Sequence, residues 1–155
     1  MCSTALVSSV DATFTMELPY RRSLGPVVGA FLSGLRDGQI VGSRTAAGRV
    51  LCPALEYDPG TGEAADEIVP VGDAGVVRHW AWVAEPLRNH PLDRPFAWVL
   101  VQLDGADTAL LHALDAGSID AVRSGVRVRA RWRAREARRG HMTDIECFEL
   151  EAGAG

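Results

Sequence analysis

Apolar and polar positions alternate most regularly near the end of the chain, over residues 126–133. Valine, alanine and tryptophan occupy the even positions of this stretch, and arginine occupies every odd position. A period of two is typical of a β-strand with one buried face and one solvent face. The pattern therefore predicts a strand whose outer face carries a row of arginines.

Four other segments have strand character. Residues 75–85, 95–104 and 108–115 are rich in β-branched, aromatic and apolar side chains, and 142–150 follows the arginine strand. Residues 118–125 favour one helical turn or a short helix. Five strands with a short helix between the third and fourth match an OB-fold barrel, whereas an immunoglobulin-like sandwich needs about seven strands. We predict an OB-fold domain over residues 73–150.

A helix is predicted ahead of these strands. Its apolar positions fall on one face at helical spacing: Val27, Val28, Phe31, Leu32 and Leu35. Ser23 can cap the start, Pro26 suits the first turn, and Gly38 lies just past the end. These signals predict an amphipathic helix within residues 23–38. Residues 1–22 show only weak periodicity and predict a flexible N-terminal arm.

Residues 39–72 turn often and have the outline of a zinc ribbon. In a zinc ribbon each of two turns would carry Cys-x-x-Cys, because four ligands close the tetrahedral site. Here those positions hold Arg44, Ala47, Asp58 and Thr61. One carboxylate without a thiolate or imidazole cannot complete the site, so we predict a degenerate, metal-free module. Because a structural zinc supplies much folding energy, we expect the module to be loose without a partner.

The predicted fold is therefore mainly β with an N-terminal helix. A five-stranded OB-fold barrel follows a degenerate zinc-ribbon-like module. The net charge of −4 argues against a general nucleic-acid binder. No apolar run reaches the length of a membrane span, and the N-terminus does not resemble a signal peptide. Three widely spaced cysteines form no ligand-like pair, so we expect a cytoplasmic protein with reduced thiols.

The usual catalytic signatures are absent from the sequence. It contains no Gly-x-Ser-x-Gly elbow, no lysine-bearing phosphate loop and no His-Glu-x-x-His. Asp104, Asp107 and Asp115 flank turns, where local hydrogen bonding is the expected role. His112 lies inside an apolar strand and must find a hydrogen-bond partner there, which favours a structural histidine. We expect neither a nucleophile nor a general base in this chain.

The arginine row and the aromatic residues remain as candidate binding features. The row can be a solvated face, a docking surface for an acidic partner, or a phosphate-binding strip. Trp80 and Trp82 lie two positions apart on one strand face. They pack in the core or contact a partner, where tryptophan is a favoured anchor. The candidate partner contacts are Phe31, Tyr57, Trp80 and Trp82.

The order of these parts, with the segments "EYDPGTGE", "PLDRPFAW" and "LDGADTALLHA", resembles a known family over residues 20–150. The family comprises zinc-ribbon and OB-fold accessory proteins, a domain of unknown function, that accompany thiolase-like and other acyl-CoA enzymes. The nearest branch is the partner subunit of actinobacterial steroid side-chain retro-aldolases. The missing ribbon cysteines depart from the family pattern.

The resemblance implies a non-catalytic subunit. A thiolase-fold aldolase partner would supply the active site, in a hetero-oligomer such as a heterotetramer, and a hydratase of the same pathway is a further implied partner. This chain would stabilise the partner and help to form the passage for a CoA thioester, with no cofactor bound by the chain alone. The complex would cleave a 17-hydroxy steroid acyl-CoA to a 17-keto steroid and a short acyl-CoA. Arg127, Arg129 and Arg131 become candidates for the CoA phosphates.

Two alternatives belong to other classes. One is a free-standing OB-fold module that binds a CoA ester or single-stranded nucleic acid. The acidic balance counts against it, and the arginine row counts for it. The other is an autonomous enzyme, for which the sequence offers no convergent nucleophile and base.

Overall fold

The computed structural model describes residues 16, 17, 19 and 23–151. The predicted arm at 1–22 therefore lies almost wholly outside the described residues. In chain order the elements are α1 (Gly25–Asp37), β1 (Ile40–Arg44), β2 (Val50–Leu51), β3 (Glu67–Val71), β4 (Ala74–Val83), β5 (Phe96–Leu103), β6 (Leu110–Asp115), the 3₁₀ turn η1 (Ile119–Ala121), β7 (Arg127–Trp132), η2 (Arg135–Ala137), η3 (Met142–Asp144) and β8 (Ile145–Leu150). No helix among these combines the length and apolar character needed to cross a membrane.

The second half of the chain closes into a five-stranded barrel with the strand order β4-β5-β6-β8-β7. Neighbouring strands are antiparallel except for the parallel pair β6 and β8. A register shift between Val77 and His79 bends β4, which pairs with both β5 and β7. The strand order and the short helix between the third and fourth barrel strands confirm the predicted OB-fold.

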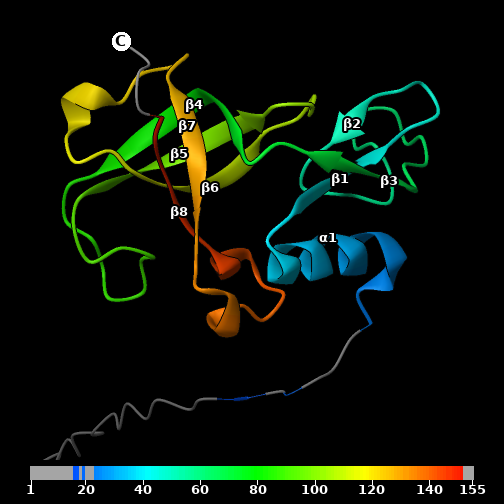
Figure 1. Ribbon diagram of the computed structural model, residues 1–155, viewed down its shortest axis with the longest axis horizontal. Coiled ribbons are helices and arrows are strands. Elements are labelled where there is room, and N and C mark those ends of the chain that lie inside the picture. The colour runs from blue at the N-terminus through cyan, green and yellow to red at the C-terminus, as the bar shows by residue number, and fades with distance from the viewer. Residues whose placement is uncertain (1–15, 18, 20–22, 152–155) are drawn as a thin grey trace, which may run out of the picture.

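A second, three-stranded sheet with the order β2-β1-β3 lies beside the barrel. Figure 1 shows this small sheet at one side of the barrel and α1 beneath it, with the C-terminal end of α1 directed towards η2 and η3. The sheet occupies the segment predicted as a ribbon-like module.

Helix α1 begins differently from the prediction and ends as predicted. Leu24 is the residue at the N-cap and no side chain caps the helix, so the expected Ser23 cap is wrong; Pro26 does lie in the first turn. At the other end, Gly38 adopts φ = 79°, a left-handed conformation that favours glycine. Its amide donates to the carbonyl of Leu35 at 3.1 Å.

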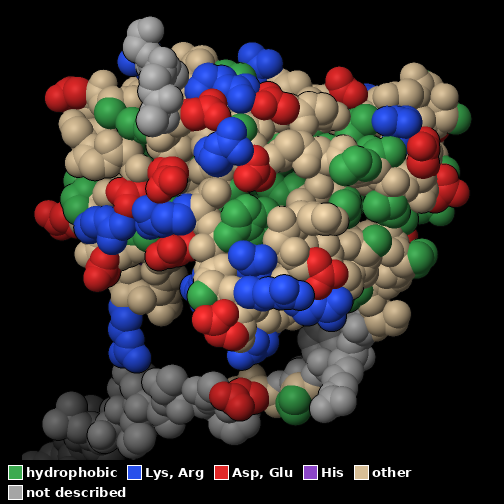
Figure 2. All heavy atoms as spheres, in the orientation of Figure 1, with side chains coloured by type: hydrophobic (Ala, Val, Ile, Leu, Met, Phe, Trp, Pro, Cys, Tyr) green, Lys and Arg blue, Asp and Glu red, His purple; other side chains and the backbone are tan. Residues whose placement is uncertain are grey.

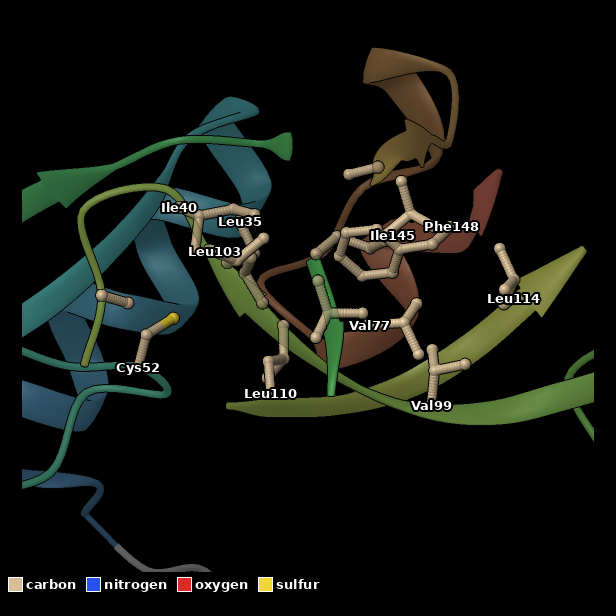
Figure 3. Close-up of a cluster of buried hydrophobic side chains, with 14 of the residues drawn as sticks. Leu35, Ile40, Cys52, Val77, Val99, Leu103, Leu110, Leu114, Ile145 and Phe148 are labelled. Atoms are coloured by element: carbon tan, nitrogen blue, oxygen red, sulfur yellow. The ribbon is translucent and has the colours of Figure 1, made fainter. Parts of the chain in front are cut away.

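One hydrophobic core joins the helix, the small sheet and the barrel. Leu35 and Ile40 are at most 2% exposed and belong to the same buried cluster as Leu103 of β5 and Phe148 of β8. Figure 3 shows Leu35 and Ile40 beside Leu103, with Ile145 and Phe148 further inside the barrel. The predicted boundary at residue 73 therefore separates two sheets but does not separate two cores.

The turn between β5 and β6 closes the edge of β2. The amide of Val50 donates to the carboxylate of Asp107 at 2.8 Å, and the amide of Asp107 donates back to the Val50 carbonyl at 2.8 Å. The Thr108 hydroxyl accepts from the Cys52 amide at 2.7 Å and donates to its carbonyl at 2.9 Å. The expectation of purely local bonding by Asp107 is wrong, because this side chain pairs with a strand 57 residues away.

We predict that Leu35→Ala lowers the free energy of unfolding by about 2–5 kcal/mol, since it leaves a cavity where helix and barrel meet. Leu111→Ala is the matched control, because Leu111 is 58% exposed. The control substitution should lower the free energy of unfolding by less than about 1 kcal/mol. Urea denaturation measures both values. Equal losses in the two variants would contradict a core shared by helix and barrel.

Candidate partner- and ligand-binding surfaces

Two tight turns of the small sheet occupy the places of the zinc-ribbon knuckles. In the first turn, the Thr45 hydroxyl accepts from the Arg49 amide at 3.2 Å, and the Gly48 amide donates to the Thr45 carbonyl at 2.8 Å. In the second turn, the Gly62 amide donates to the Asp58 carbonyl at 2.7 Å. Gly48 and Gly62 have φ of 88° and 74°, so both turns require a residue that tolerates a left-handed conformation.

Polar contacts join the two turns. The buried carboxylate of Asp58 accepts from the Gly60 amide at 2.8 Å and from the Arg49 guanidinium of the opposite turn at 2.5 Å. The Ala47 amide donates across to the Glu63 carboxylate at 3.0 Å. These contacts tie together the two turns of the small sheet.

The Asp58 carboxyl has a lowered pKa. The hydrogen bond from the Gly60 amide is the largest cause, and the charge and hydrogen bond of Arg49 add to it. Burial acts in the opposite direction and raises the pKa, because it disfavours the charged form. Asp58 is 1% exposed, so its charge needs these donors.

The other three supposed ligand positions have separate environments. Arg44 pairs with Glu67 at 3.2 Å along the sheet, and Ala47 and Thr61 are exposed. Across the described ranges, no three His, Cys, Asp or Glu side chains are grouped as metal ligands. Sequence reasoning missed Thr45, which is 2% exposed and caps the first turn. Its place directly before the turn, typical of a capping threonine, was the available signal.

The arginines of β7 are paired with carboxylates of the same chain. The Arg127 guanidinium donates to both oxygens of Asp104, at 2.7 and 2.8 Å, and to Glu151 at 3.1 Å. Arg129 bridges Asp73 at 2.6 Å and Glu151 at 2.8 Å. The Arg127 hydrogen bond lowers the pKa of Asp104, and the Arg129 hydrogen bond lowers that of Glu151.

Arg131 completes this paired row. It lies within ion-pair distance of three carboxylates, those of Asp115, Glu146 and Glu149, at 3.2–3.5 Å. A phosphate group would have to displace carboxylates from each of the three arginines. The geometry therefore favours the solvated-face interpretation of Arg127, Arg129 and Arg131.

The four candidate partner residues have different environments. Phe31 is 3% exposed in the shared core, so its side chain offers no surface to a partner, and we correct that expectation. Tyr57 is 62% exposed and Trp80 is 38% exposed. Trp82 is partly buried and packs against the core. The helical spacing of Phe31 fits a core residue or a partner contact. Because β1 and the barrel pack against α1, Phe31 is a core residue.

Tyr57 is part of an exposed apolar surface that we call the docking patch: Leu24, Val28, Leu55 and Tyr57. These side chains line a hollow at the N-terminal end of α1, together with Ser23, Gly25 and Glu56. Leu24 is 53% exposed and Leu55 38% exposed. An apolar hollow at the surface is typical of a protein interaction site. Sequence reasoning found Tyr57 but missed Leu24 and Leu55, because the structure alone brings the helix start next to residues 55–57.

His112 has the structural role expected of it. Its Nδ1 accepts from the Ala113 amide at 2.9 Å, so its Nε2 carries the proton and donates to the Met142 carbonyl at 3.2 Å. Burial lowers the pKa of this histidine. Both ring nitrogens are therefore occupied.

We predict that Asp58→Asn lowers the melting temperature at pH 7 by about 5 °C, since it removes the charge that pairs with Arg49. The folded pKa of Asp58 lies below the unfolded value of about 4. Its stabilising effect is therefore present above pH 4 and is lost as the pH falls through the folded pKa. The difference between variant and wild type should shrink at acid pH.

Asp66→Asn is the control for this measurement, because Asp66 is exposed and makes no ion pair or side-chain hydrogen bond within the described chain. Thermal melts at several pH values would compare the three proteins. If Asp58→Asn had the same melting temperature as wild type at pH 7, the Arg49–Asp58 contact would not hold the two turns together.

Comparisons with known proteins agree with this architecture. Residues 68–133 match the family described as the ChsH2 C-terminal OB-fold domain. No curated protein matches the sequence. A DUF35-family protein of unknown function from Sulfolobus solfataricus has a similar structure, with a TM-score of 0.60 and 18% identity over 83% of this chain and 85% of that one.

A chain of the Ltp2-ChsH2(DUF35) aldolase also has a similar structure. The TM-score is 0.59 and the identity 19%, over 84% of this chain and 98% of that one. The likeness in fold thus extends beyond the barrel to the helix and the small sheet. The expected resemblance is confirmed as a similarity: residues 68–133 match the ChsH2 C-terminal OB-fold family, and the chain shares the fold of a DUF35-family protein.

Proposed function

We propose that this chain is a non-catalytic accessory subunit of a thiolase-fold enzyme that acts on a CoA thioester. The observation that carries the proposal is the match of residues 68–133 to the ChsH2 C-terminal OB-fold domain. The similar fold of a chain in the Ltp2-ChsH2(DUF35) aldolase supports it. More specifically, we propose that the partner is a retro-aldolase that shortens a steroid acyl-CoA side chain in the cytoplasm of an actinobacterium.

The chemistry of the described residues supports a non-catalytic role. Burial raises the pKa of the Cys52 thiol to about 12 and that of Cys147 to about 11, so neither is a thiolate at neutral pH. Both nitrogens of His112 are engaged. A nucleophile activated by a neighbouring base, the usual arrangement in covalent catalysis, is therefore not formed by these groups.

The docking patch is the surface that we propose for the catalytic subunit. Tyr57 is the residue type favoured as an interface anchor, and the two leucines add apolar area around it. The ribbon turns lie in the same module, so binding there would also restrain them. Trp80, on the barrel, is a second candidate contact.

The CoA thioester is proposed as a ligand of the complex, and no resident cofactor is assigned to this chain. The chain would help to form the passage to the partner's active site, in a hetero-oligomer that can include a hydratase of the same pathway. The pairing of Arg127, Arg129 and Arg131 weighs against single-stranded nucleic acid as the ligand, because their charge is already balanced by carboxylates.

Affinity capture of the tagged chain from its native host tests the proposal. We expect a thiolase-fold protein to co-purify at near-equal amount. Purification of the chain alone, or with nucleic acid that salt removes, would favour the free-standing binding module instead.

We predict that Tyr57→Glu weakens assembly with the captured subunit by at least about tenfold, because it places a charge in an apolar contact. Ile119→Glu is the control, since Ile119 is 45% exposed on η1 and outside the docking patch. Surface plasmon resonance gives both affinities, and circular dichroism checks the fold. Equal affinities would place the interface elsewhere.

A further inference from the structure

A second group of arginines gathers where the C-terminal end of α1 meets the η2 segment. A surface hollow there, which we call the arginine hollow, is lined by Arg36, Asp37, Arg135, Glu136, Arg138 and Arg139. Four guanidinium groups thus face two carboxylates. Figure 2 shows basic side chains gathered below the centre of the visible face, where Figure 1 places the end of α1 and η2.

The arginine hollow differs from the paired row on β7. Arg36 pairs with its neighbour Asp37 at 3.2 Å. Within residues 23–151, no ion pair joins Arg135, Arg138 or Arg139 to a carboxylate. Other arginines of the described chain also lack an ion pair, but these three line one hollow together.

The fold fixes the position of Arg138. Its Nε donates to the Arg133 carbonyl at 2.8 Å, and its guanidinium carbon lies 5.3 Å from the centre of the Trp132 ring. Gly38 leaves room for it, because a Cβ at that position would overlap the guanidinium. Arg138 thereby also places a cation at the C-terminal end of α1, which the helix dipole favours.

The segment that carries the other two arginines packs closely on the helix. A Cβ at Gly140 would lie 3.2 Å from the Leu32 carbonyl oxygen. The Arg139 guanidinium donates to the carbonyls of Glu136 and Arg138 at 2.7 and 2.9 Å. Arg135 makes no side-chain hydrogen bond among the described residues, so its guanidinium has every donor free. Backbone carbonyls therefore position the guanidinium groups of Arg138 and Arg139, and Arg135 adds a guanidinium whose donors are all available.

We infer that the arginine hollow binds phosphate groups of a nucleotide-bearing ligand. Guanidinium groups present paired donors that match phosphate oxygens, and several of them around one hollow match a ligand with more than one phosphate. A CoA thioester carries a 3′-phosphate and a pyrophosphate. Its identity as the ligand rests on the proposed function, whereas the phosphate chemistry rests on the arginines alone.

Titration of the full chain with CoA, 3′-dephospho-CoA and inorganic phosphate tests the inference, with NMR signals of the arginine Nε–H groups as the readout. We expect CoA to bind more tightly than 3′-dephospho-CoA, and both to weaken as salt rises. The Arg135→Gln/Arg139→Gln variant should bind CoA about tenfold more weakly, because charge-assisted hydrogen bonds are lost. Arg123→Gln, an exposed arginine outside the hollow, should bind as wild type does.

The single variant Arg135→Gln separates a binding effect from a folding effect, since this side chain makes no hydrogen bond among the described residues. It should still weaken CoA binding severalfold at an unchanged melting temperature. Absence of CoA binding, or equal affinity in wild type and the double variant, would overturn the inference. Assembly with the captured subunit is a separate measurement. If CoA binds but no thiolase-fold partner is captured, the inferred phosphate site stands and the proposed function is overturned.

Discussion

The edge pairing between β2 and the turn after β5 is the contact on which the rest of the molecule depends. Val50 of β2 and Cys52, which follows β2, would otherwise leave their backbone amide and carbonyl groups unpaired, and buried backbone groups are seldom left so. Asp107 and Thr108 satisfy them from the barrel. Through this contact, and through Leu35 in the shared core, the small sheet and the OB barrel form one folding unit.

The small sheet is further held by contacts between its two turns. The Arg49–Asp58 ion pair and the Ala47–Glu63 hydrogen bond cross between the two turns, and the barrel holds the base of the sheet. Arg49 is exposed, so solvent screens this pair, and its contribution is smaller than that of a structural metal. A module held in this way can gain stability from a bound subunit, which is consistent with an accessory role.

Period-two alternation predicted β7, and runs of β-branched, aromatic and apolar residues predicted β4, β5 and β6. Pro26 and Gly38 helped to place the helix. The sequence could not show which carboxylates approach which arginines. Asp73, Asp104 and Glu151 are far apart in the chain, and only barrel closure brings them to Arg127 and Arg129. The burial of Phe31 and the exposure of Leu24 likewise depend on where α1 docks, since the apolar helix face alone does not decide which of its residues stay accessible.

We propose that this chain binds and positions the ligand while its partner performs the chemistry. The most direct test is the carbon–carbon bond cleavage of a steroid acyl-CoA by the captured thiolase-fold subunit, measured with this chain present, with it absent, and with this chain alone. We predict cleavage by the complex, loss of activity or stability when the chain is omitted, and no cleavage by the chain alone. Cleavage by the chain alone, or equal activity and stability of the catalytic subunit without it, would contradict the account.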